Sequence, residues 1–194
     1  MFYCLTILIS MAVISAVNVF AVAPIYGYEF YEIIIWTTVC TISAIVIDGV
    51  CALVVRRLLP KRWFEGIKKG FVATPKESKF YQKIGIKKWK DKVIDLGVFT
   101  GFRKNKIYEP KNNEYVLRYI LEANYGVVCH LVGVGLGVFC ALCSPKNLWL
   151  TIGVPVAMVN LVLSTLPVFV LRYNLIKLHK LYRVNALLNK KSSE

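Results

Sequence analysis

Four long hydrophobic runs separated by polar segments set the pattern of this 194-residue chain. Each run holds about 20 mostly apolar residues, enough for an α-helix to cross the roughly 30 Å hydrocarbon layer of a bilayer. The pattern predicts an all-α integral membrane protein with a single membrane domain over residues 1–194. We expect its four transmembrane helices at about residues 2–23, 33–55, 116–143 and 148–171.

The stretch between the second and third runs, residues 56–115, has a different pattern. Aromatic and aliphatic residues recur in its first part at near-helical spacing among lysines and arginines: Trp63, Phe64, Ile67 and Phe71. This pattern is typical of an amphipathic helix lying in the membrane interface. Thr74 and Pro75 then indicate a turn followed by a new helix. Residues 175–194 form a basic, amphipathic tail that we expect at the membrane surface.

Basic residues are unevenly distributed. Residues 1–55 contain no Lys or Arg, whereas residues 56–118 hold 18 of the 25 basic residues and only 6 acidic ones. Because basic loops beside transmembrane helices stay in the cytoplasm, we expect the segment 56–115 and the tail on the cytoplasmic side. Both chain termini would then be cytoplasmic, and the expected location is the cell membrane with a multi-pass topology.

The formal net charge of +14 narrows the choice of partners. Nucleic acid is disfavoured because the basic segment lies between membrane-length runs. Anionic lipids of the inner leaflet attract such a segment by roughly 1 kcal/mol per basic residue, and a substrate headgroup or donor carrying phosphates would be attracted in the same way. The cysteines and histidines show no zinc-ligand spacing, so we expect no metal site.

Three ionisable residues within the spans are candidates for chemistry, because such residues are costly in a membrane. Glu122 and His130 are eight residues apart on the third span, so they share one side of the helix but are separated by a rise of about 12 Å. A neutral imidazole at His130 could accept a proton from a hydroxyl, or it could donate to a carbonyl of a neighbouring helix. Asp48 could pair with a basic residue or help to orient His130.

Other polar or small residues in and near the spans have a structural and a functional interpretation. Asn160 is expected to form a hydrogen bond between helices, and Gly133, Gly135 and Gly137 offer flat surfaces for close helix contact. Arg172 is either a cytoplasmic anchor or a clamp for an anion. The run Lys87-Lys88-Trp89-Lys90 is either a solvated surface facing lipid headgroups or part of a binding site.

Several segments, in this order and spacing, resemble the glycosyl-4,4'-diaponeurosporenoate acyltransferase family. The segments are Phe80-Tyr81-x-Lys83, Ile86-Lys87-Lys88-Trp89-Lys90, Asp95, Glu122-x7-His130, and Leu171-Arg172-Tyr173-Asn174 followed by Leu178 and Leu181. The similarity covers about residues 56–184. Residues 1–55 depart from the family's pattern, and this departure bears on the substrate more than on the chemistry.

The resemblance implies transfer of a fatty acyl chain to a hydroxyl of a membrane glycolipid, such as a glycosyl carotenoid, at the cytoplasmic face. By position, His130 would be the general base and Glu122 its partner or a substrate contact. Because the rise of about 12 Å between them prevents a direct hydrogen bond on a straight helix, a catalytic set would need a third group, which Asp48 or Asn174 could supply. The residues expected to line the substrate site are Lys88, Trp89, Lys90, Arg172 and Asn174. No cofactor is expected, and acyl-CoA or an acyl carrier protein would serve as donor.

Two other functions fit the residues alone. A lipid-binding or scaffolding subunit would use the basic segment and the glycine-rich span, and it would tolerate replacement of His130. A small transporter would use Asp48 and Glu122 as proton carriers, although two carboxyl groups in four spans offer little pathway. A homo-oligomer is compatible with each interpretation.

Overall fold

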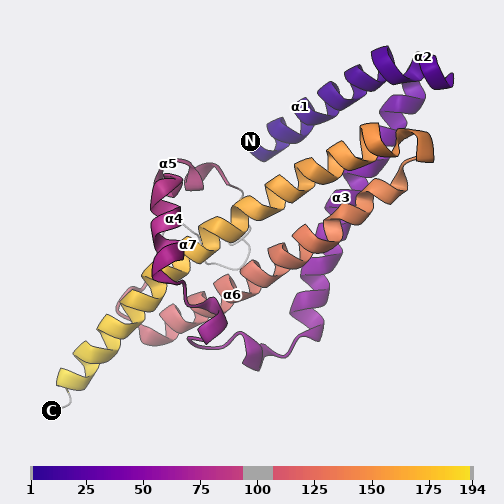
Figure 1. Cartoon of the computed structure of the whole chain (residues 1–194). Helices are drawn as coiled ribbons and strands as arrows, with labels where there is room; N and C mark the ends of the chain where they lie inside the picture. The colour runs from indigo at the N-terminus through magenta and orange to yellow at the C-terminus, as the bar shows by residue number, and fades with distance from the viewer. Residues whose placement is uncertain (1, 94–106, 193–194) are drawn as a thin grey trace. The chain divides into compact units, whose positions relative to one another are not determined.

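The computed structural model describes residues 2–93 and 107–192 (Figure 1). The described residues are almost entirely helical and contain no strand. Asp95, one of the residues in the family pattern, lies outside them. The α-helices are α1 Phe2–Val17, α2 Ala23–Tyr26, α3 Phe30–Leu58, α4 Pro75–Lys83, α5 Ile86–Trp89, α6 Asn113–Leu136 and α7 Val154–Ser192.

Shorter helical turns connect or extend these helices. Among the described residues, two of these are π-helical, Asn18–Val22 and Trp149–Gly153. Five others in the same part of the chain are 3₁₀-helical: Lys61–Trp63, Lys69–Phe71, Lys90–Lys92, Gly137–Cys143 and Lys146–Leu148.

Within residues 2–93 and 107–192, four helical segments are long and apolar enough to cross a membrane, so the predicted all-α, multi-pass fold is confirmed. They are Phe2–Tyr26, Phe30–Leu58, Asn113–Cys143 and Lys146–Lys190. The fourth segment is the longest because α7 does not end where the hydrophobic run ends. The residues expected to form a separate tail, 175–194, are the continuation of α7 as far as Ser192.

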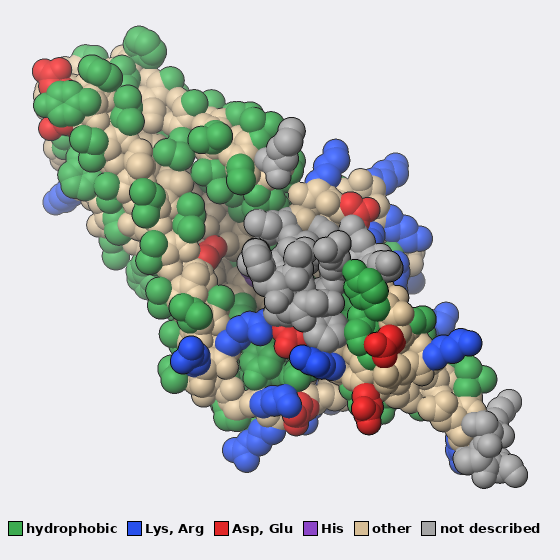
Figure 2. All heavy atoms as spheres, turned by 180° about the vertical axis from the view of Figure 1, so that it is seen from behind, with side chains coloured by type: hydrophobic (Ala, Val, Ile, Leu, Met, Phe, Trp, Pro, Cys, Tyr) green, Lys and Arg blue, Asp and Glu red, His purple; other side chains and the backbone are tan. Residues whose placement is uncertain are grey.

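The chain divides into two compact units, and both α6 and α7 contribute to each. Unit 1 comprises Met1–Val54 and Cys129–Thr165, and unit 2 comprises Val55–Val128 and Leu166–Glu194. Lys146 is the only one of the 25 Lys and Arg residues in unit 1, so the other 24 belong to unit 2. The face drawn in Figure 2 agrees with this segregation, since most of the Lys and Arg side chains gather in one part of it and another part carries mainly hydrophobic side chains.

In unit 1, hydrogen bonds tie α1 to the first half of α7, and α1 lies along it in Figure 1. The Tyr3 hydroxyl donates to the Leu163 carbonyl over 2.9 Å. Asn18 is fully buried, and its amide donates to the carbonyls of Ile14 and Thr151, each over 2.8 Å. Since a π-helical turn alters the regular backbone bonding, Asn18 joins the two places where α1 and α7 depart from α-helical geometry.

Unit 2 has its own hydrophobic core, built from the first half of α6 and the second half of α7. Val116, Ile120 and Leu175 are fully buried there, and Leu178 is nearly so. The residues expected in a surface-bound tail therefore begin as core residues.

The expected interfacial helix at Trp63–Phe71 is absent, which corrects that prediction. Two 3₁₀ turns stand in its place, because Pro60 starts the segment and Gly66 adopts a left-handed conformation with φ of +71°. Phe64 is buried rather than facing lipid, and its ring stacks on Tyr125 with centroids 4.0 Å apart. The segment thus folds onto α6.

The new helix predicted after Thr74 is confirmed. Thr74 caps α4, since its hydroxyl accepts a hydrogen bond from the backbone N–H of Glu77 at 3.2 Å. Pro75 occupies the first turn, where no backbone donor is needed. The cap fixes the position of Glu77, which faces α7 within unit 2.

Candidate active site

Asp48 is the centre of a polar cluster inside unit 1. It projects from α3, and the Ser164 hydroxyl donates to its Oδ2 over 2.7 Å. The Asn160 amide, one turn earlier on α7, reaches its Oδ1 at 3.5 Å. The helix-to-helix hydrogen bond expected of Asn160 is therefore present, although it is long.

His130 belongs to the same unit and faces the same cluster. It is half-buried on α6 and lies close enough to Asp48 for an electrostatic interaction. At 100° per residue, His130 and Gly133 lie on the same side of α6, and Gly137 begins the 3₁₀ turn that continues this stripe. Asp48 lies against this stripe, because a side chain added at Gly133 would meet its Oδ1 at 2.8 Å.

The two inward glycines on this stripe make room for the polar cluster. A Cβ at Gly137 would collide with the Asn160 amide nitrogen, and it would lie 3.4 Å from Asp48 Oδ1. Gly135 lies on another side of α6 and has nothing within 4 Å of its Cβ position. Of the three glycines expected to allow close helix contact, Gly133 and Gly137 therefore do so and Gly135 does not.

Glu122 lies on α6 within unit 2, where its carboxylate pairs with Arg56. The Arg56 Nη2 to Glu122 Oε2 distance is 2.8 Å, and the guanidinium also lies over the Tyr125 ring at 5.6 Å from its centroid. Arg56 is the first basic residue of the chain, so this pair closes the end of α3 onto α6.

A second polar cluster in unit 2 joins Arg172 of α7 to α4. The guanidinium donates to both carboxylate oxygens of Glu77, at 2.8 and 2.7 Å, and to the Gly70 carbonyl at 2.9 Å. The Tyr81 hydroxyl donates to Glu77 as well, at 2.5 Å. Such bidentate, charge-assisted pairs are among the strongest hydrogen bonds in proteins.

The contacts within this cluster shift the pKa values of Glu77 and Tyr81. The hydrogen bond from Arg172 is the largest cause that holds the pKa of Glu77 below its ordinary value of 4.5. Burial, together with the neighbouring Glu77, raises the pKa of Tyr81. Arg172 is therefore paired within the protein, and its expected role as a clamp for a substrate anion stays a prediction.

The other expected substrate contacts also lie in unit 2. Lys88 is exposed on α5, and the Trp89 indole N–H donates to the Ile84 carbonyl over 3.1 Å. Lys90 pairs with Asp91 at 3.3 Å. Asn174 is buried on α7. Whether these side chains contact a substrate stays a prediction.

Several residues of these clusters are not evident from the sequence pattern. A serine in a span usually bonds to its own helix, so Ser164 is not distinctive, although its spacing of four from Asn160 is a signal. Glu77 stands three residues after a Thr cap, which marks it as a first-turn carboxylate. His179 follows the apolar run, yet it is buried, and its Nε2 has no hydrogen-bond partner among the described residues.

A comparison with protein-family models shows which family the chain belongs to. The family model described as glycosyl-4,4'-diaponeurosporenoate acyltransferase matches residues 60–184. The chain belongs to this family. The resemblance stated from the sequence is confirmed, and the protein is an acyltransferase. No curated protein and no solved structure matches the chain.

The family match divides the polar cluster of unit 1. His130, Asn160 and Ser164 lie within the matched residues, whereas Asp48 lies before them. The helices α1 and α3 also lie before the matched residues in the sequence. The carboxyl group of this polar cluster therefore comes from a part of the chain that precedes the matched residues.

The glycine stripe gives a stability prediction. Gly133→Ala forces Asp48 to move and breaks its bond with Ser164, so it should destabilise the protein by about 1–3 kcal/mol. Gly135→Ala is the matched control, since its Cβ meets nothing. Thermal unfolding of the purified protein in detergent should show a lower Tm for Gly133→Ala alone. Equal Tm values for the two variants would contradict the close contact.

The Glu77–Arg172 pair gives a pH prediction. Because the pKa of Glu77 is lowered on folding, the pair stabilises the folded state at all pH values above 4.5. This stabilisation is lost as the pH falls through the lowered pKa. The gap in Tm between wild type and Glu77→Gln should therefore be constant from neutral pH down to about 4.5 and narrow below it.

The control for this experiment is Glu65→Gln. Glu65 forms an exposed pair with Lys61 at 3.2 Å, and exposed pairs contribute little. We expect almost no difference in Tm between wild type and Glu65→Gln at any pH. A gap for Glu77→Gln that stayed unchanged into acid would refute the role of the carboxylate.

Proposed function

We propose that this acyltransferase moves a fatty acyl chain from a thioester donor onto a hydroxyl of a membrane glycolipid, at the cytoplasmic face. The observation that carries the proposal is the family match over residues 60–184, because that family is described by a glycosylated carotenoid acceptor. The four membrane-length helices suit an acceptor that stays in the bilayer.

His130 is the residue we assign as general base. A neutral imidazole accepts a proton at neutral pH, and a carboxyl group beside it holds the ring and stabilises the imidazolium that forms. We assign that second role to Asp48, because it belongs to the same unit and lies close enough to His130 for an electrostatic interaction. Glu122 is paired with Arg56, so we assign the partner role to Asp48 rather than to Glu122.

The proposed step conserves atoms and charge. The acceptor hydroxyl oxygen attacks the thioester carbonyl while His130 takes its proton. The carbon–oxygen ester bond forms, the carbon–sulfur bond breaks, and His130 returns the proton to the departing thiolate. Acyl-CoA or an acyl carrier protein supplies such a thioester, and neither requires a metal or a resident cofactor.

Unit 2 is assigned the recruitment of the donor. It holds 24 of the 25 basic residues, and basic segments beside transmembrane helices favour the cytoplasmic side. Lys88 is exposed within this surface. Both proposed donors are anionic, and their local concentration rises near such a surface. The same charge attracts anionic lipids of the inner leaflet.

The assigned base gives a direct test. His130→Gln keeps a hydrogen-bonding side chain of similar size but cannot take the proton, so acyl transfer should fall by about 100-fold or more. Untargeted lipidomics of membranes from cells with the wild-type gene, the deletion and His130→Gln measures this. An acylated glycolipid should be lost in the deletion and in the variant alike.

Protein level and Tm provide the control for folding. A His130→Gln protein that is present and folded and still makes the acylated lipid would contradict the assigned role of His130. A lipid profile unaffected by the deletion would refute the proposed acceptor class.

A further inference from the structure

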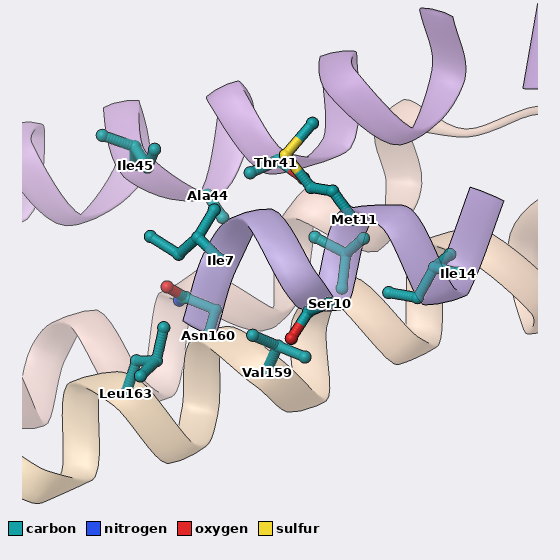
Figure 3. Close-up of a pocket in the computed structure, with 11 residues that line it drawn as sticks. Ile7, Ser10, Met11, Ile14, Thr41, Ala44, Ile45, Val159, Asn160 and Leu163 are labelled. Carbon is teal, nitrogen blue, oxygen red and sulfur yellow. The ribbon is translucent and has the colours of Figure 1, made fainter. Parts of the chain in front are cut away.

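Unit 2 contains a pocket of about 340 Å³ between the turn that follows α3 and the first part of α6. Pockets of about 300–1,000 Å³ commonly hold small molecules. The cavity of unit 1 drawn in Figure 3 is only about 40 Å³, which is room for a few water molecules. The pocket of unit 2, called the basic pocket below, is lined by Lys61, Glu65, Gly66, Leu117, Arg118 and Leu121.

The outer part of the basic pocket favours an anion. Lys61 and Arg118 are exposed there and come from two separate segments of the chain. Glu65 is the acidic residue of the lining, and it pairs with Lys61 at 3.2 Å. A guanidinium binds a phosphate group through two parallel hydrogen bonds, and an ammonium binds it as a point charge. The two cationic side chains therefore suit a phosphate group.

The inner part of the basic pocket is apolar. Leu121 is buried and Leu117 is half-buried. The two leucines are one turn apart on α6, so they lie on one side of it and extend the pocket by about 6 Å along the helix. Since α6 begins a membrane-length segment at Asn113, this direction leads from the membrane surface into the hydrocarbon layer. A ligand with a phosphate group outside and a hydrocarbon chain inside fits both parts.

Exposed apolar residues beside the basic pocket favour a position at the level of the lipid headgroups. Leu58, the last residue of α3, is 72% exposed, and Trp63 is 55% exposed. Tryptophan is enriched where the membrane meets water. A soluble anion would leave both side chains in water, whereas the hydrocarbon chains of a lipid would cover Leu58. The surroundings therefore favour a lipid as the ligand.

We propose that the basic pocket binds one anionic phospholipid. Its phosphate group is held by Lys61 and Arg118, and one of its acyl chains lies along Leu117 and Leu121. A zwitterionic lipid carries a cation beside its phosphate group, which the two basic side chains repel. The site is independent of the proposed function, because lipid binding is measured without acyl transfer.

Native mass spectrometry of the full-length protein tests the site. Dioleoyl phosphatidylglycerol and dioleoyl phosphatidylcholine are titrated separately, and the fraction of protein that carries one lipid gives each affinity. Wild type should bind phosphatidylglycerol about tenfold more tightly or better. The double variant Lys61→Gln with Arg118→Gln should lose most of this preference, because two basic residues beside an anionic headgroup change its affinity by about tenfold or more.

The matched control is Lys68→Gln with Lys69→Gln. These residues are exposed in the same unit and do not line the basic pocket, yet their replacement removes the same amount of charge. The control should bind phosphatidylglycerol as wild type does, and both double variants should keep the wild-type Tm. An equal loss of affinity in the two double variants would overturn the proposal, because it would show general attraction to basic residues rather than a site.

A photoreactive lipid tests the position of the site in the wild-type protein. Phosphatidylglycerol with a diazirine in one acyl chain is cross-linked to the protein in detergent, and the labelled peptides are mapped by mass spectrometry. Labels should concentrate on the peptide that contains Leu117 and Leu121, and an excess of unlabelled phosphatidylglycerol should remove them. Labels absent from this peptide would overturn the proposal.

Coenzyme A distinguishes a lipid site from a site for the phosphate groups of a soluble donor. We expect an excess of coenzyme A to leave the binding of phosphatidylglycerol unchanged. Coenzyme A that displaces the lipid from wild type, and that binds the control but not the variant of Lys61 and Arg118, would overturn the lipid proposal and assign the pocket to the donor.

Discussion

The carboxyl group of Asp48 is the constraint on which the arrangement of unit 1 depends. A carboxyl group in the middle of a membrane helix costs about 3 kcal/mol or more if it faces lipid. The cost is reduced by turning Asp48 towards Ser164 and Asn160 on α7. That orientation requires the third helix to come close, and α6 has glycine at the point of contact. One polar side chain thus sets the packing of three helices.

The same constraint links the structure to its chemistry. His130 is on the side of α6 that faces Asp48, and the two side chains are close enough for an electrostatic interaction within unit 1. The histidine and the two donors on α7 lie within the residues that match the family, whereas the carboxyl group lies before them. The proposed mechanism therefore combines a base from the matched residues with a carboxyl group from α3.

Hydrophobic length was enough to predict the four spans, because a bilayer requires about 20 apolar residues whatever their partners. The family was also evident from the sequence, since its short segments keep their order and spacing. The contacts of Phe64 were not predictable from periodicity, because Pro60 and Gly66 break the helix and the aromatic ring finds Tyr125 on another segment. Likewise, the sequence around Arg172 favours a membrane anchor, because nothing in it indicates that α4 places Glu77 beside the guanidinium. Long-range pairs of this kind depend on tertiary packing, which local patterns do not encode.

Acyl transfer by purified Asp48→Asn protein in liposomes tests the central claim most directly. Asparagine still accepts the hydrogen bond from Ser164, so the helices should pack and the Tm should stay close to that of wild type. The carboxyl group beside His130 is lost, however, and transfer from an acyl thioester to extracted native lipids should fall by about 100-fold. A folded Asp48→Asn protein that transfers acyl chains at the wild-type rate would contradict the account.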